Sequence, residues 1–181
     1  MNDFVANLIK SDALRWHALT VVESLELETA CIGAGFVRNL VWDHLHGKQS
    51  NCRESDIDVL WFDAEDIDPQ IDREWEQKLR ADHPEFDWSV KNQARMHIRN
   101  GDAPYANVAD AMRFWPETAT AIAARKDGDR CELIAPFGFD DLLGMIVRPT
   151  SRAAHKLEAF EARVAKKDWR SRWPQVSIQT N

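Results

Sequence analysis

The stretch that decides the fold is "IGAGFVRNLVW", residues 32–42. An apolar segment over residues 29–32 predicts a short strand, which stops at Gly33-Ala34-Gly35. The apolar residues that follow lie on one helical face, and Gly47 is placed to end that helix. Glycines at a strand-to-helix turn let the backbone approach a ligand, and the free N–H groups of a helix's first turn bind anions. The stretch therefore predicts a strand–turn–helix unit suited to a phosphate.

A second motif, "SDIDV" at residues 55–59, places two carboxylates on a predicted strand. Residues i and i+2 of a strand share a face, so Asp56 and Asp58 project side by side, about 6–7 Å apart at the backbone. Hard divalent cations such as Mg²⁺ prefer such oxygen ligands, completed by water and substrate phosphates. Asp63 falls on the opposite face of the same strand and is excluded. The pair therefore predicts a cation site at this strand.

A third carboxylate comes from "FDWSVK", residues 86–91. If Phe86 and Trp88 point into the core, Asp87 points to the other face, where it could join the first two. Three carboxylates on neighbouring strands can hold two metal ions about 3.5–4 Å apart, an arrangement used in phosphoryl transfer. Ser89 shares this face and is the alternative third position, although serine is a poor ligand. Lys91 also shares it, either to meet a triphosphate or as a solvated lysine at the end of a strand.

The order of elements along the chain favours the α+β class. Strands and helices alternate early, and Asp127-Gly128 predicts a two-residue hairpin. A last helix is expected after Thr150-Ser151. We expect a single domain over residues 1–181: a small mixed sheet packed by helices, with a core over about 25–115 and a C-terminal hairpin and helical part over about 116–181.

Composition restricts the function. The net charge of −7 disfavours a protein that coats nucleic acid, so a small acceptor or a locally basic groove is expected. No apolar run approaches the ~20 residues of a membrane span, so no membrane partner is expected. Three cysteines, widely spaced, predict neither a disulfide framework nor a zinc site, and the expected location is the cytoplasm. The tryptophans within apolar patterns, Trp115 among them, are expected in the core.

Two resemblances to known families follow from these motifs. "AGFVRN", residues 34–39, resembles the Gly-Gly-x-Val-Arg-Asp element of tRNA CCA-adding enzymes, within the polymerase β-like nucleotidyltransferase superfamily. "WSVKNQARMH" (88–97) and "APFGFDDLL" (135–143) resemble a family of small bacterial nucleotidyltransferase-like proteins, over about residues 25–170.

The resemblance assigns roles residue by residue. It implies that Ala34 and Gly35 occupy the phosphate-binding pair, that Arg38 is the arginine of the element, and that the three aspartates named above are metal ligands. The sequence departs from the pattern at Ala34, which replaces a glycine, and at Asn39, which replaces an aspartate. Nucleotide binding is thus expected at Ala34, Gly35, Arg38 and Lys91, and catalysis at Asp56, Asp58 and Asp87.

The expected reaction is transfer of a nucleoside monophosphate from an NTP to a hydroxyl group. It would use a two-ion Mg²⁺ site, with Mn²⁺ as the alternative ion, and the acceptor would be a small molecule rather than a long nucleic acid. The alternative is a catalytically silent nucleotide-binding or interaction protein on the same scaffold. A third reading, RNA binding through "KKDWRSRWP" (166–174), competes with a segment that docks its two tryptophans on the core, which we favour. The oligomeric state is left open.

Overall fold

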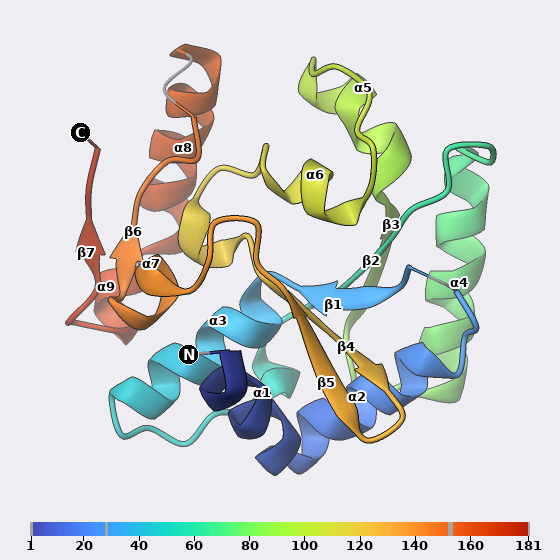
Figure 1. Cartoon of the computed structure of the whole chain (residues 1–181), viewed down its shortest axis with the longest axis horizontal. Helices are drawn as coiled ribbons and strands as arrows, with labels where there is room; N and C mark the ends of the chain where they lie inside the picture. Colours follow the sequence, from blue (N-terminus) through green and yellow to red (C-terminus); the bar gives the residue numbers. More distant parts are fainter. Residues whose placement is uncertain (1, 28, 152–153, 181) are drawn as a thin grey trace.

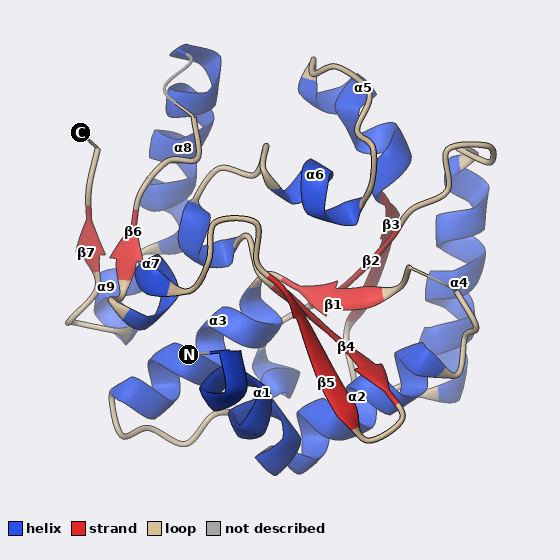
Figure 2. Ribbon diagram, viewed as in Figure 1, coloured by secondary structure: helices blue, strands red, loops and turns tan. Residues whose placement is uncertain are grey.

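A five-stranded mixed sheet forms the centre of the protein, with helices on both faces (Figures 1 and 2). The computed structural model describes residues 2–27, 29–151 and 154–180. The strand order is β3-β2-β1-β4-β5, with β2 and β3 parallel and the other pairs antiparallel. The strands are β1 (Cys31–Gly33), β2 (Ile57–Trp61), β3 (Trp88–Asn92), β4 (Ala123–Asp127) and β5 (Arg130–Ile134). The expected α+β class with a small mixed sheet is confirmed.

Helices and short elements surround this sheet. The α-helices are α1 (Asn2–Ser11), α2 (Ala13–Glu23), α3 (Gly35–Leu45), α4 (Pro69–Asp82), α5 (Met96–Asn100), α6 (Val108–Met112), α7 (Asp140–Leu143), α8 (Ala154–Lys167) and α9 (Trp169–Arg172). The 3₁₀ turns are η1 (Cys52–Glu54), η2 (Gln93–Arg95) and η3 (Thr118–Thr120), and β6 (Ile146–Val147) pairs with β7 (Ser177–Ile178). Residues 152–153, between the expected start at Thr150-Ser151 and α8, lie outside the described residues.

The hairpin that was expected near Asp127-Gly128 adds β4 and β5 to the same sheet as β1–β3. Its two-residue loop is Gly128-Asp129, because Asp127 pairs with Arg130. Gly128 has a φ of 57°, which a glycine adopts without steric cost. The hairpin loop therefore lies one residue further along than the sequence suggested.

The two faces of β2 have different environments. Ile57, Val59 and Trp61 belong to the large core shared with α1, α2 and α3. Leu60, on the opposite face, packs in a smaller cluster with residues of α6. This alternation orients Asp58 away from the large core, towards the side of the sheet covered by α5, α6 and α8 (Figure 1).

Helix α4 covers the edge of the sheet at β3. Its residues Asp72, Glu76 and Arg80 follow one another at four-residue intervals and so share one helical face. Asp72 accepts from the Asn92 N–H at 2.8 Å, Glu76 accepts from the Val90 N–H at 3.1 Å, and Arg80 donates to the Trp88 carbonyl at 2.9 Å. These bonds satisfy backbone groups that an exposed edge strand leaves unpaired. The helix that connects the parallel strands thus also seals the sheet.

The C-terminal segment returns to α3. Trp169 and Trp173 are each only 3% exposed and pack edge-on against Trp42. The Trp173 indole and the Arg172 guanidinium both donate to the buried Asp43 carboxylate, at 2.8 and 2.9 Å. This confirms that the tryptophans of "KKDWRSRWP" dock on the core. No helix in the described residues is both long and apolar enough to cross a membrane.

Candidate active site

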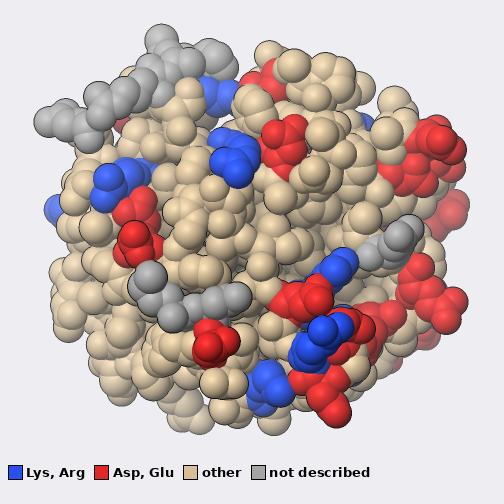
Figure 3. Space-filling model, in the orientation of Figure 1, with Lys and Arg blue, Asp and Glu red and all other residues tan. Residues whose placement is uncertain are grey.

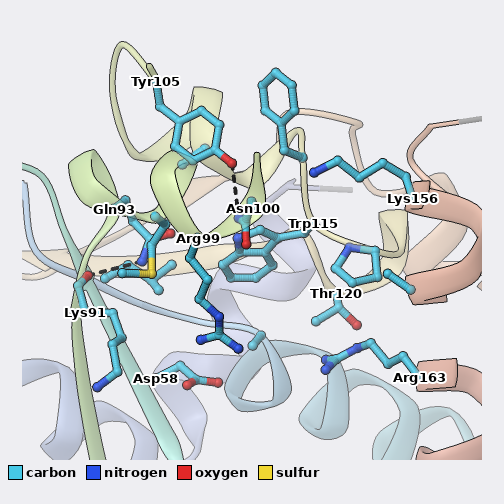
Figure 4. Close-up of a pocket in the computed structure, with 17 residues that line it drawn as sticks. Asp58, Lys91, Gln93, Arg99, Asn100, Tyr105, Trp115, Thr120, Lys156 and Arg163 are labelled. Atoms are coloured by element: carbon cyan, nitrogen blue, oxygen red, sulfur yellow. Dashed lines mark hydrogen bonds between the residues drawn. The ribbon is translucent and has the colours of Figure 1, made fainter. Parts of the chain in front are cut away.

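A cavity of about 470 Å³ opens over the face of the sheet that carries Asp58 (Figure 4). The sheet supplies Asp58, Leu60 and Lys91, and the helices and turns around it supply the rest of the wall. The lining residues are Ala34, Asp58, Leu60, Lys91, Gln93, Met96, Arg99, Asn100, Tyr105, Ala111, Phe114, Trp115, Pro116, Thr120, Lys156, Ala159 and Arg163. Its volume falls in the range of small-molecule and cofactor sites.

Asp58 is the one carboxylate among these lining residues. Burial, and then the nearby Asp56 charge, raise the pKa of Asp58 to about 6, against the opposing effects of Arg163, Lys167 and Lys91. A carboxylate that is desolvated and lies beside a second one favours a compensating cation. The local charge therefore fits a cation at Asp56 and Asp58, as the strand pattern predicts.

Asp87 shares the face of Asp58 but is displaced along the strand. Asp58 lies opposite Ser89 in the register of β2 and β3, and the Asp87 carbonyl accepts from the Ile57 N–H. The Asp87 side chain is 68% exposed and accepts from Arg80 of α4 at 3.2 Å. The carboxylates of Asp56, Asp58 and Asp87 do not all lie within 4.8 Å of one another, in the described part of the chain. The three are thus not assembled as metal ligands here, and that role for Asp87 stays a prediction.

Four cationic side chains line the cavity around Asp58, and they come from β3, α5 and α8. Lys91 lies 3.4 Å from Glu76, Lys156 lies 2.7 Å from Asp102, and Arg163 lies 2.7 Å from the buried Glu117. Figure 4 shows the Arg99 and Arg163 guanidinium groups directed towards the space above Asp58. Arg99 makes no ion pair within the described ranges. This concentration of positive charge suits a polyanion such as a triphosphate.

The opposite wall of the cavity is aromatic. It consists of Tyr105, Phe114 and Trp115, with Tyr105 and Phe114 rings 5.0 Å apart. Trp115 was expected in the core, but it is only partly buried and lines the cavity. Such a wall offers π-faces to a planar base.

The glycine turn serves packing as well as the cavity. A Cβ on Gly33 would lie 2.8 Å from Leu60 and 3.3 Å from Trp115, so this position accepts no side chain without movement. Ala34 lines the cavity and has a φ of 56°, a backbone region that favours glycine. Its N–H donates to the Ile122 carbonyl at 3.1 Å. The Ala34 N–H therefore already has a partner, which the sequence did not indicate.

The start of α3 offers free amides just beyond Ala34. The first helical hydrogen bond runs from the Arg38 N–H to the Ala34 carbonyl, so the N–H groups of Gly35 and the next two residues precede the helical ladder. Gly35 itself does not line the cavity, and a Cβ there would lie 3.3 Å from the Asn39 amide nitrogen. A phosphate role for Gly35 stays a prediction.

Arg38 lies behind the cavity wall rather than in it. Its guanidinium donates to Thr120 Oγ1 at 2.7 Å and to Asn39 Oδ1 at 2.8 Å, and it lies 5.3 and 5.2 Å from the ring centroids of Trp42 and Trp169. Burial lowers the pKa of Arg38 to about 10. Since Thr120 lines the cavity, Arg38 reaches the site only through that residue.

Several residues of the cavity have no signal in the sequence. Thr120, Arg99, Lys156 and Arg163 come from segments far from the Asp-x-Asp strand, and no spacing links them to it. The stretch "WSVKNQARMH", residues 88–97, carries a family resemblance but ends before Arg99, and its Arg95 is used for structural pairing. Arg95 donates to the buried Asp72.

The geometry defines a class of protein. A mixed sheet whose Asp-x-Asp strand adjoins a cation-lined cavity, next to a glycine strand-to-helix turn, is the arrangement of nucleotidyltransferases. A family model described as "Nucleotidyltransferase" matches residues 20–178, and the chain belongs to this family.

The solved structures agree. A protein whose NMR structure was described as revealing a CCA-adding enzyme head domain is 32% identical, with a TM-score of 0.88 over 98% of this chain and 95% of that one. This neighbour confirms the polymerase β-like superfamily.

More distant neighbours share the fold alone. A tRNA-processing enzyme (apo form I) is 18% identical with a TM-score of 0.59, over 93% of this chain and 44% of that one. The apo form 2 of a tRNA-processing enzyme is 18% identical, with a TM-score of 0.53 over 83% of this chain and 41% of that one. The chain therefore spans less than half of these enzymes. No curated protein matches the sequence.

Proposed function

We propose that the protein transfers a nucleoside monophosphate from an NTP to a hydroxyl group and releases pyrophosphate. The observation that carries the proposal is the cavity, which combines Asp58, four cationic side chains and an aromatic wall. Membership of the nucleotidyltransferase family supports an NTP substrate.

In this proposal, different residues of the cavity bind different parts of the NTP. Lys91, Arg99, Lys156 and Arg163 neutralise the triphosphate and orient it above the sheet. The aromatic wall packs against the base, and the unpaired amides at the start of α3 lie within the same strand–turn–helix unit that contributes Ala34 to the cavity. Catalysis of this kind is mainly positioning and charge neutralisation, so no cysteine or histidine nucleophile is required.

A divalent cation fits the two carboxylates at the start of β2, where Asp56 immediately precedes the strand and Asp58 lies in it. Asp56 and Asp58 supply the oxygen ligands that Mg²⁺ prefers, and the raised pKa of Asp58 reflects a carboxylate that lacks full compensation. When bound, Mg²⁺ or Mn²⁺ would neutralise charge on the reacting phosphates. Asp87 would complete the ligand set and help to activate the acceptor hydroxyl after leaving Arg80.

The acceptor in this proposal is a small molecule. Among the described residues on the face in Figure 3, basic side chains are scattered between acidic ones and form no broad basic surface. Together with the net charge of −7, this favours a local basic cavity over a nucleic-acid track. The cytoplasmic location stays a prediction from the sequence.

The alternative is a nucleotide-binding protein without catalysis. One observation favours it: the Asp87 carboxylate is engaged with Arg80 rather than with the other aspartates. Binding without turnover would then be the whole activity.

The deciding experiment incubates the purified protein with each labelled NTP, Mg²⁺ or Mn²⁺, and a small-molecule fraction of a cell extract. A labelled product together with pyrophosphate supports the transferase, and the product identifies the acceptor class. Saturable NTP binding by calorimetry with no product in any fraction supports the silent binder. An absence of NTP binding contradicts both functions.

A further inference from the structure

A second cluster of ligand-type side chains lies away from the cavity. It consists of His17 on α2, His83 at the C-terminal end of α4, and Glu85 two residues later, and none of the three lines the cavity. Figure 1 shows α2 beside the lower end of α4. The nucleotidyl-transfer chemistry uses none of these residues.

The ligand atoms in this cluster are spaced as a metal requires. One nitrogen or oxygen from each residue lies within 4.8 Å of the other two. The His17 Nε2 atom lies 3.2 Å from Glu85 Oε1, and the His83 Nδ1 atom lies 3.6 Å from the same oxygen. A tetrahedral ion with ligands at about 2.0–2.1 Å needs neighbouring ligand atoms about 3.3–3.5 Å apart. The two distances to Glu85 thus lie close to the separation that one tetrahedral ion requires.

The side chains are held in this arrangement by their surroundings. The His83 N–H donates to the Leu79 carbonyl, and the His83 carbonyl accepts from the Trp88 indole at 2.9 Å. Pro84 restricts the turn between His83 and Glu85. The centroid of the His17 ring lies 5.7 Å from that of His83 and 6.0 Å from that of Phe86.

We propose that His17, His83 and Glu85 form a binding site for a divalent transition-metal ion of the Zn²⁺ class. Imidazole nitrogens favour Zn²⁺ and its neighbours over Mg²⁺, so this site differs in kind from the carboxylates on β2. The side chains are partly exposed, which leaves the fourth position to water. The ion joins α2 to the turn between α4 and β3, two elements that are otherwise linked here by the hydrogen bond from His17 to Glu85 and by the ring contacts of His17.

The test is calorimetric titration of ZnCl₂ into the full, tag-free chain after removal of metals. All variants carry Asp58→Asn, which removes one of the two carboxylates at the start of β2 and so weakens any competing cation site there equally in every variant. Loss of an outer partner of a metal ligand costs 10–100-fold in affinity, so His83→Gln and Glu85→Gln should each weaken Zn²⁺ binding at least about tenfold. His44→Gln, on the exposed face of α3, is the matched control and should leave the affinity unchanged. Equal affinities in all three variants would overturn the site.

A second readout covers variants that fold poorly. Co²⁺ in a tetrahedral nitrogen and oxygen site gives visible absorption, which should appear in the His44→Gln protein and be lost in His17→Gln. An ion that binds the folded state alone also raises the melting temperature, and only in proteins with the cluster intact. If a folded His44→Gln protein showed neither the Co²⁺ absorption nor the rise in melting temperature, the cluster would not be a metal site, and its role would be limited to the His17–Glu85 hydrogen bond.

Discussion

Asp58 of β2 lies directly opposite Ser89 of β3, and Asp87 lies two residues earlier on the same face. The side chain that faces Asp58 across the strands is therefore the Ser89 hydroxyl. The Asp87 carboxylate lies two residues further back and is paired with Arg80. Any metal ligation by Asp87 needs the Arg80 ion pair to open.

The role of Asp87 is tested by Asp87→Asn. We expect metal-dependent turnover to fall at least about 100-fold, since loss of a direct ligand exceeds the effect of losing its outer partners. Stability should change little, because an exposed ion pair contributes about 0–1 kcal/mol. Asp82→Asn, which breaks the exposed pair with Lys78 on α4, is the control. Full activity of Asp87→Asn would restrict Asp87 to its contact with Arg80.

The requirement for Asp58 is tested by Asp58→Asn in the same turnover assay. We expect a loss of at least about 10³-fold, comparable with removal of a main electrostatic group from an active site. Asp129→Asn, in the exposed β4–β5 loop, should retain full activity. A variant at Asp58 that turned over NTP normally would remove β2 from the mechanism.

The pKa of Asp58 predicts how stability depends on pH without metal. Because the pKa is raised from 3.8 to about 6, the folded protein holds this proton more tightly than the unfolded chain. The resulting stabilisation is complete below the unfolded pKa and is lost as the pH rises through about 6. At about pH 7.5, Asp58→Asn should be more stable than wild type by roughly 1–3 kcal/mol.

Thermal melts with a chelator at several pH values would measure this difference. The difference in stability between wild type and Asp58→Asn should disappear at about pH 4, where the wild-type carboxyl is largely protonated. Saturating Mg²⁺ should stabilise wild type and not Asp58→Asn. A stability difference that is the same at about pH 7.5 and at about pH 4 would mean that the pKa of Asp58 is not raised on folding.

Arg38 and Arg99 form a matched pair of arginines, one behind the cavity and one lining it. Arg38→Lys removes the planar donor that joins Thr120 to Asn39, so we expect a stability loss of about 2–4 kcal/mol. Arg99→Lys should leave stability unchanged and weaken NTP binding several-fold. Melting curves and calorimetric titration of both variants would check this; the reverse pattern would place Arg38 at the nucleotide.

Ala34 gives a further test at the glycine turn. Glycine relieves the strain of a φ of 56°, about 1–2 kcal/mol, against a backbone entropy cost of roughly 0.5–1 kcal/mol. Ala34→Gly should therefore raise stability by up to about 1 kcal/mol in a denaturant titration. NTP affinity should not change, since the amide keeps its bond to Ile122. A loss of stability would show that the alanine methyl contributes packing that exceeds its strain.

The sequence predicted the local parts of this fold well. Alternation along β2 gave the orientation of Asp58, and the glycine turn gave the start of α3, because both signals depend on neighbouring residues. The register between β2 and β3 does not depend on neighbouring residues in the sequence, because it is set by packing across the strands. For this reason the sequence placed Asp87 and Ser89 on the same face as Asp58 but could not decide which of the two lies opposite it.

The cavity was the least predictable part. Arg99 and Arg163 belong to separate helices that meet only in the folded chain, and a charged residue on a short helix looks the same in sequence whether it faces solvent or a ligand. Trp115 shows the same limit, because an aromatic residue in an apolar pattern fits a core and a cavity wall equally well.

The docking of the C-terminal segment on α3 has a consequence for synthesis on the ribosome. Asp43 is buried, and two of its hydrogen-bond donors, Arg172 and Trp173, lie 129 and 130 residues further along the chain. Until they emerge, the nascent chain would have to bury that charge with Ser50 as its remaining partner, which is strongly unfavourable. The helix that begins at the glycine turn would therefore reach its final packing only after Arg172 and Trp173 have left the exit tunnel.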